Sequence, residues 1–175
     1  MKKQSVLTLL MAVAVRLTAQ LQPGAAAPDF TVQDINGQSW HLYELLDQEK
    51  IVVLEISTTW CPPCWAYHNS HALQEVYAAH GPGGDGNLQV LFVEADPDTD
   101  VECLYGLSDC NSFTPGNWVN GTTYPYLNAA AIADSFQVVY FPAVLLICPN
   151  KKTYQVGQLS ADELWEKASG CPVAS

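Results

Sequence analysis

The sequence has few basic residues and lacks internal repeats and low-complexity tracts. Lys and Arg account for 7 of its 175 residues, against 18 Asp and Glu, so the net charge is −11. A chain this acidic repels nucleic acid and anionic lipid, which excludes nucleic acid as a partner. Its apolar fraction of 49% is ordinary for a globular protein, which excludes a disordered or fibrous chain. The length suits one domain with a hydrophobic core.

The first twenty residues have the pattern of a secretory signal peptide. Lys2 and Lys3 precede a short apolar run at 6–15, which is too short for a comfortable transmembrane helix. No cysteine lies near the cleavage region to carry a lipoprotein lipid. Arg16 directly follows the run, so an uncleaved membrane anchor stays open. We expect a periplasmic or extracellular domain over 21–175, with four basic residues against 18 acidic residues and a net charge near −14.

Apolar segments typical of buried strands and helices alternate along this domain with turn-forming residues, as in an α/β protein. Asn36-Gly37 is a favoured turn pair and predicts an N-terminal β-hairpin. The expected strands are 51–56, 88–93, 143–148 and 153–156, and the expected helices are 42–46, 62–80, 126–137 and 161–168. A long, turn-rich insertion occupies about 96–125. This order predicts a three-layer fold, in which a mixed central sheet carries helices on both faces.

A Cys-Pro-Pro-Cys motif, Cys61 to Cys64, stands where the first buried strand gives way to a helix. The free N–H groups and the macrodipole of a helix start favour a thiolate at Cys61, which is the attacking species in disulfide exchange. Cys64, one turn further in, would resolve the mixed disulfide. Because Pro62 and Pro63 have no N–H to donate, we expect a moderately lowered pKa for the Cys61 thiol.

Two further residues belong to the candidate site. Glu55 interrupts an apolar strand, and a carboxyl group there is costly to bury unless it is needed. We expect burial to raise its pKa and Glu55 to accept the proton of Cys64, unless the side chain reaches solvent at a sheet edge. Pro142 precedes the strand at 143–148, and a cis Phe141–Pro142 bond would bring this loop against the start of the motif helix; a trans bond stays open.

The sequence resembles the TlpA-like thiol-disulfide oxidoreductases of the thioredoxin superfamily over nearly its whole mature length. The matching segments are Ala27-Pro28-Asp29-Phe30, Asn36-Gly37, residues 51–64 (IVVLEISTTWCPPC), Tyr124-Pro125 and residues 132–147 (IADSFQVVYFPAVLLI). The resemblance implies that Cys61 is the nucleophile, Cys64 the resolving thiol and Trp60 the aromatic residue beside them. It also implies that Pro142 is the cis-proline that holds a substrate chain, and that Glu55 stands where thioredoxins carry a buried acid.

The sequence departs from the family pattern in three places. Asn69 stands where the family often has a proline that kinks the helix, and Ala143 replaces the usual threonine after the cis-proline. The insertion is long and carries Cys103 and Cys110. These departures bear on the partner more than on the chemistry.

Four cysteines lie outside the motif, and spare cysteines in an exported chain usually pair. We expect structural disulfides between Cys103 and Cys110, which would shorten the free loop, and between Cys148 and Cys171, which would pin the C-terminus. A second redox role for the Cys103/Cys110 pair stays open as an alternative.

The favoured function is a thiol-disulfide oxidoreductase, most simply a reductase, acting on disulfides of exported proteins. Its partners would be protein thiol or disulfide substrates and an upstream electron donor. We expect a monomer. Disulfide exchange needs no cofactor and no metal. The alternatives are a copper-binding metallochaperone, which CxxxC spacing would suit better, and a redox-silent binding module. A structural zinc half-site lacks a second ligand pair. Thr58 stands three residues before Cys61, which resembles the peroxiredoxins and keeps a peroxidase as a weaker alternative, but Leu54 stands where that pattern has a proline.

Overall fold

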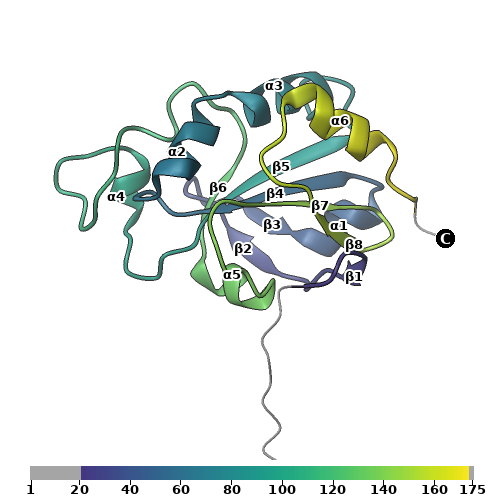
Figure 1. Ribbon diagram of the computed structural model, residues 1–175, viewed down its shortest axis with the longest axis horizontal. Helices are drawn as coiled ribbons and strands as arrows, with labels where there is room; N and C mark the ends of the chain where they lie inside the picture. The colour runs from purple at the N-terminus through teal and green to yellow at the C-terminus, as the bar shows by residue number, and fades with distance from the viewer. Residues whose placement is uncertain (1–20, 174–175) are drawn as a thin grey trace, which may run out of the picture.

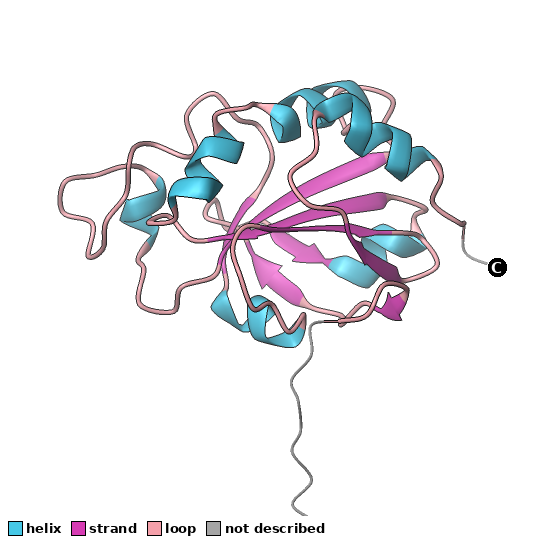
Figure 2. Cartoon of the chain, viewed as in Figure 1, coloured by secondary structure: helices cyan, strands magenta, loops and turns pink. Residues whose placement is uncertain are grey.

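The computed structural model describes residues 21–173, which form three layers around a mixed sheet (Figures 1 and 2). The strand order is β1-β8-β7-β4-β5-β6, in which β4, β5 and β6 are parallel and β7 and β8 alternate in direction. The strands are β1 (Ala25–Ala26), β4 (Ile51–Ser57), β5 (Leu88–Glu94), β6 (Tyr126–Asn128), β7 (Ala143–Ile147) and β8 (Lys152–Gln155). The expected mixed sheet is confirmed, whereas the expected signal peptide over 1–20 lies outside the described residues.

Helices cover both faces of the sheet, as expected. They are α1 (Leu42–Asp47), α2 (Pro62–His68), α3 (Ala72–His80), α4 (Val101–Leu104), α5 (Ala130–Ser135) and α6 (Ala161–Ser169). Alternate side chains of β4 point to opposite faces, so Val53 packs in the core beneath α2, α3 and α6 while Leu54 packs against α1 and α5. None of the helices within 21–173 has the length and apolar character needed to cross a membrane.

A separate hairpin of β2 (Thr31–Gln33) and β3 (Ser39–His41) lies near the N-terminal part of the described chain. Its turn contains Gly37 at φ 83°, a conformation that glycine adopts without strain. The Asp34 carboxylate closes the turn because it accepts the N–H groups of Asn36 and Gln38, and the Trp40 indole donates to it at 3.0 Å.

The single helix predicted over 62–80 is wrong, because the chain forms α2 and α3 with a break between them. The side chains of Asn69 and Ser70 each donate a hydrogen bond to a carbonyl of the preceding turn, at 2.8 and 2.6 Å. Such side-chain bonds compete with the helical pattern. His71 then takes a left-handed conformation, φ 60°, and α3 starts in a new direction.

The helix predicted over 126–137 is also wrong at its start. Residues 126–128 form strand β6 beside β5, with Tyr126 opposite Phe92, and the helix α5 begins only at Ala130. Pairing with a sheet edge overrides local helix preference here, since the Tyr126 ring also packs on Phe92 with ring centroids 4.8 Å apart. The short strand β1, which pairs with β8, is not among the strands expected from the sequence.

The insertion at 96–125 leaves the sheet after β5 and returns at β6, and in Figure 1 it extends beside α2. It contains the short helix α4 and otherwise turns and bends. Trp118 and Tyr124 are buried beneath it, in the same core cluster as Cys61 and Cys64. The insertion therefore has its own apolar anchor next to the motif.

Candidate active site

The Cys-Pro-Pro-Cys motif lies at the start of α2, and three residues, 58–60, separate it from the end of β4 at Ser57. Cys61 is the N-cap residue, and its Sγ accepts the backbone N–H of Cys64 at 3.3 Å. The two cysteines form a disulfide, with Cys61 nearly buried and Cys64 fully buried. Pro62 occupies the first turn of the helix, where a missing N–H costs no hydrogen bond. The structure thus gives Cys61 the helix-start position at which a thiolate is stabilised.

Glu55 is fully buried in the middle of β4. It shares a strand face with Val53, which packs in the same cluster as both motif cysteines, so its carboxyl group points to the α2 side of the sheet. The Ser57 hydroxyl donates to Oε1 at 2.8 Å, while Oε2 has no hydrogen-bond partner among residues 21–173. Burial raises the Glu55 pKa to about 7, and the Ser57 bond lowers it only in part. The group can therefore exchange a proton near neutral pH.

A second buried carboxyl group, Glu94, lies at the end of β5 opposite Ser57. Its two oxygens accept the backbone N–H groups of Thr59, at 2.7 Å, and Asp96, at 3.0 Å. Glu94 therefore ties the turn before Cys61 to the start of the insertion. Burial raises its pKa to about 7, against the lowering effect of these two bonds. The sequence analysis missed Glu94, because it ends an apolar strand instead of interrupting one as Glu55 does.

Trp60 lies beside the motif, with 41% of its surface exposed. Its indole N–H donates to the Asp96 carboxylate at 2.6 Å, and its ring meets Phe141 edge to face with centroids 6.5 Å apart. The Phe141–Pro142 peptide bond is cis, and Pro142 is buried. The structure thus brings Trp60 and the loop before β7 together at the start of α2.

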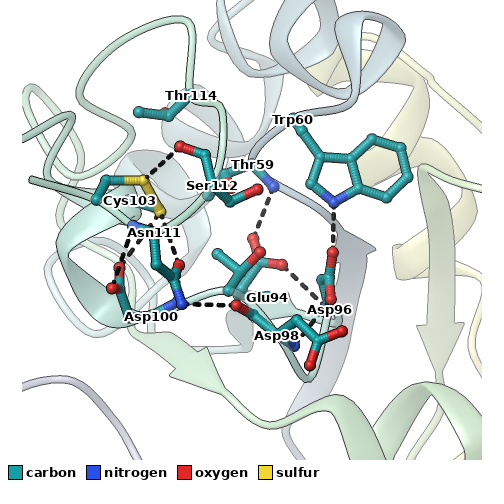
Figure 3. Close-up of a disulfide and its surroundings, with 12 residues drawn as sticks. Thr59, Trp60, Glu94, Asp96, Asp98, Asp100, Cys103, Asn111, Ser112 and Thr114 are labelled. Carbon is teal, nitrogen blue, oxygen red and sulfur yellow. Dashed lines mark hydrogen bonds between the residues drawn. A yellow bond between two sulfur atoms is a disulfide. The ribbon is translucent and has the colours of Figure 1, made fainter. Parts of the chain in front are cut away.

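Figure 3 shows how the insertion is held beside Trp60. The Asn111 side chain donates to the Asp98 carbonyl at 2.7 Å and accepts the Asp100 N–H at 3.0 Å. Cys103 pairs with Cys110 in this same segment, and its Sγ lies 3.3 Å from an Asp100 carboxylate oxygen. A continuous set of bonds therefore runs from Trp60 through Asp96 to the second disulfide.

The insertion also packs directly on α2. A Cβ at Gly116 would lie 2.9 Å from the ring of Trp65, the residue after Cys64. The rings of Trp65 and Trp118 enclose His68, each with its centroid 5.1 Å from the imidazole. Burial lowers the His68 pKa to about 4, so the ring is neutral at pH 7.

The third disulfide joins Cys148, after β7, to Cys171, after α6. Among residues 21–173, the one group of three close metal-ligating side chains is Asp100, Cys103 and Cys110, and its two sulfurs are bonded to each other. The second disulfide thus already uses the sulfurs that a metal would need.

The chain matches the family model described as "AhpC/TSA family" over residues 23–153, and no curated protein sequence matches it. Solved structures that resemble it include a secreted disulfide oxidoreductase of Mycobacterium tuberculosis (22% identity, TM-score 0.59, covering 80% of this chain and 94% of that one). The thioredoxin domain of a thiol-disulfide oxidoreductase from Bacteroides vulgatus is similar too (21%, TM-score 0.57, 85% and 96%). So is StoA from Bacillus subtilis (18%, TM-score 0.58, 81% and 97%).

At these identities the solved structures show the fold alone, and they confirm the expected thioredoxin-like architecture. The family model supplies the assignment, since it covers most of the chain, including the motif. The chain belongs to the AhpC/TSA family of thioredoxin-like oxidoreductases.

Proposed function

We propose that this chain is an exported thiol-disulfide oxidoreductase that reduces disulfides of exported proteins through Cys61 and Cys64. The observation that carries the proposal is the closed Cys61–Cys64 pair at the start of α2, on the sheet face to which the buried Glu55 also points. The domain would comprise 21–175, after a signal peptide over 1–20, and would act as a monomer in the periplasm or outside the cell. The thioredoxin-like structures from secreted and disulfide-handling proteins support this assignment.

Reduction proceeds in two exchanges that balance without a cofactor. The Cys61 thiolate attacks one sulfur of the substrate disulfide, that S–S bond breaks, and a substrate thiolate leaves. Glu55 then takes the Cys64 proton, and the Cys64 sulfur attacks Cys61 Sγ and releases the second substrate thiolate. The substrate gains two electrons, and the chain ends with the Cys61–Cys64 disulfide. An upstream dithiol donor restores the reduced pair.

The other site residues would position the substrate, and the other two disulfides would stabilise the fold. Trp60, exposed beside the motif, and the Phe141–Pro142 loop would flank an extended substrate chain. Cys103–Cys110 and Cys148–Cys171 would be structural disulfides that stay closed during turnover.

Trapping of the mixed disulfide tests the function. Cys64→Ser, in which Cys61 can attack but nothing resolves the product, should accumulate a covalent adduct with a disulfide-bonded substrate. The matched Cys61→Ser variant should form none. Equal amounts of adduct in both variants would contradict the assignment of Cys61 as the nucleophile. If Cys61→Ser keeps the function of the wild-type protein, a redox-silent binding module is favoured.

The reduction potential tests the direction. Mass spectrometry after equilibration in thiol-disulfide buffers would report the Cys61/Cys64 pair and the other two disulfides together. A value near or below about −220 mV supports a reductase, whereas a value near about −120 mV indicates an oxidant. Consumption of peroxide by the reduced chain would instead favour a peroxidase.

A further inference from the structure

The part of the chain that builds the site contains no basic side chain of the lysine or arginine type. From residue 51 to residue 150 the sequence has neither Lys nor Arg, and this stretch includes the motif, the insertion and the Phe141–Pro142 loop. His68 in this stretch is buried, and its pKa is lowered to about 4. The acidic groups near the motif therefore lack lysine or arginine partners from their own segment.

The lysines of the described chain lie at the other end of the sheet. Lys50 directly precedes β4, whereas the motif follows the opposite end of that strand. Because β7 runs antiparallel to β4, the turn after β7 returns to the start of β4, and this turn carries Lys151 and Lys152. Lys167, in α6, lines a pocket with Cys148 and Cys171, and Cys148 directly follows the end of β7. The lysines of residues 21–173 therefore lie at the end of the sheet away from the motif, although acids such as Asp47, which pairs with Lys151 at 2.8 Å, lie there too.

Acidic side chains gather instead on the insertion beside Trp60. Asp96 accepts the Trp60 indole, and Asp98 follows it in the same turn (Figure 3). Within residues 21–173, the carboxylates of Asp98, Glu102 and Asp109 take part in no hydrogen bond or salt bridge. They are exposed or half-buried, so they remain available to a partner.

Exposed apolar side chains border the motif, and one of them, Trp60, is bonded to Asp96 at the start of the insertion. Trp60 is 41% exposed next to Cys61, and Tyr140 and Val139, directly before the Phe141–Pro142 bond, are 53% and 63% exposed. Phe141 touches Trp60, which joins the two segments into one surface around the motif. This surface combines an apolar centre with nearby acidic side chains. Exposed apolar groups beside a reactive motif are typical of a surface that binds a partner, whereas a purely solvated acidic face would not need them.

We propose that the Cys61–Cys64 site acts on proteins or peptides whose reactive disulfide is flanked by lysine or arginine side chains. The inference rests on the proposed function and names the substrate class of that same site. Opposite charges on the enzyme and a basic substrate speed their encounter and orient the two molecules. An acidic substrate is repelled by the acidic surface, so its encounter with the site is slower. The lysines do not offset the acidic charge around the motif, because they lie at the other end of the sheet and Lys151 is already paired with Asp47.

A competition between matched peptides tests the proposal. Three peptides would carry the same disulfide loop flanked by Lys, Gln or Glu, and the rate constant for their reduction by the pre-reduced protein would be measured. Each rate is divided by that for reduction by dithiothreitol, a neutral dithiol, which removes the effect of the flanking charges on the disulfide itself. The Lys peptide should exceed the Glu peptide by about tenfold at low salt, and the ratio should shrink as salt is added.

Two sets of charge-neutralising variants locate the effect. The Asp98→Asn, Glu102→Gln, Asp109→Asn triple variant should lose most of the preference while reducing the Gln peptide at the wild-type rate. The control variant, Glu49→Gln, Asp162→Asn, Glu166→Gln, changes the net charge equally on other elements and should keep the preference.

The outcomes separate this inference from the proposed function. Equal normalised rates for the Lys and Glu peptides, or an equal loss of preference in both triple variants, would overturn the inference while leaving the reductase intact. If none of the three peptides is reduced, the proposed function fails and the inference falls with it.

Discussion

Glu55 and Glu94 are buried acids on neighbouring strands, and their hydrogen bonds give them different tasks. Glu94 uses both oxygens to bind backbone N–H groups, so it is a positioning residue for the turn before Cys61. Glu55 keeps one oxygen without a partner in the described part of the chain, and its pKa is raised to about 7. The free oxygen and the near-neutral pKa suit Glu55 for proton transfer, whereas Glu94 is already occupied.

Glu55→Gln should slow the resolving step by at least about tenfold near neutral pH, because the amide cannot accept the Cys64 proton. In the wild-type protein that rate should rise with pH through about 7, where the Glu55 carboxyl group ionises. Stopped-flow measurement of mixed-disulfide decay across pH 5–9 checks both effects. Glu94→Gln is the matched control and should keep the rise. The same pH profile in Glu55→Gln would rule out this role.

At the scale of elements, the contact between the insertion and α2 rests on Gly116. A methyl group there would lie 2.9 Å from the Trp65 ring, closer than side chains approach. Gly116→Ala should therefore lower the free energy of unfolding by about 1–3 kcal/mol as Trp65 and the insertion move apart. Gly83→Ala is the control, since its Cβ would meet no atom within 4 Å. Urea unfolding of both variants checks the prediction, which is wrong if they are equally stable.

The disulfide between Cys148 and Cys171 ties α6 to the end of β7. It closes a loop with a sequence separation of 23 residues, so opening it should cost about 3 kcal/mol through the entropy of the unfolded chain. Cys148→Ala with Cys171→Ala should show this loss in urea unfolding while the Cys61/Cys64 potential stays unchanged. A shifted potential would mean that the pair is coupled to the redox centre.

The sequence predicted the elements whose signal is local, and the errors arose where distant contacts decide. The buried strands, the hairpin turn and the motif at a helix start each have a local pattern, and the structure has all three. Residues 126–128 were predicted as helix because only the neighbouring β5 makes them a strand. Glu94 was missed for a related reason: its role depends on Thr59, which is far away in the sequence and adjacent in space.

Across residues 21–173, three buried groups set the main dependence of stability on pH between about pH 4 and 7. Folding raises the pKa of Glu55 and of Glu94 from 4.5 to about 7, so between these values the folded chain holds protons that the unfolded chain has released. Both groups therefore make the protein less stable as pH rises through this window. Folding lowers the His68 pKa from 6.5 to about 4, which makes the protein more stable as pH rises from 4 to 6.5.

The two acids outweigh the one histidine between pH 4.5 and 6.5, so wild-type stability should fall with rising pH by about 1 kcal/mol per unit. In Glu55→Gln with Glu94→Gln only the histidine remains of the three, and stability should rise with pH over the same range. Urea unfolding of the oxidised proteins at half-unit steps measures both slopes. Folding also lowers the pKa values of Asp85 and Glu163, but these groups change stability at lower pH and do not alter the difference between the two slopes. A double variant whose stability still falls would mean that these acids ionise as they do in the unfolded chain.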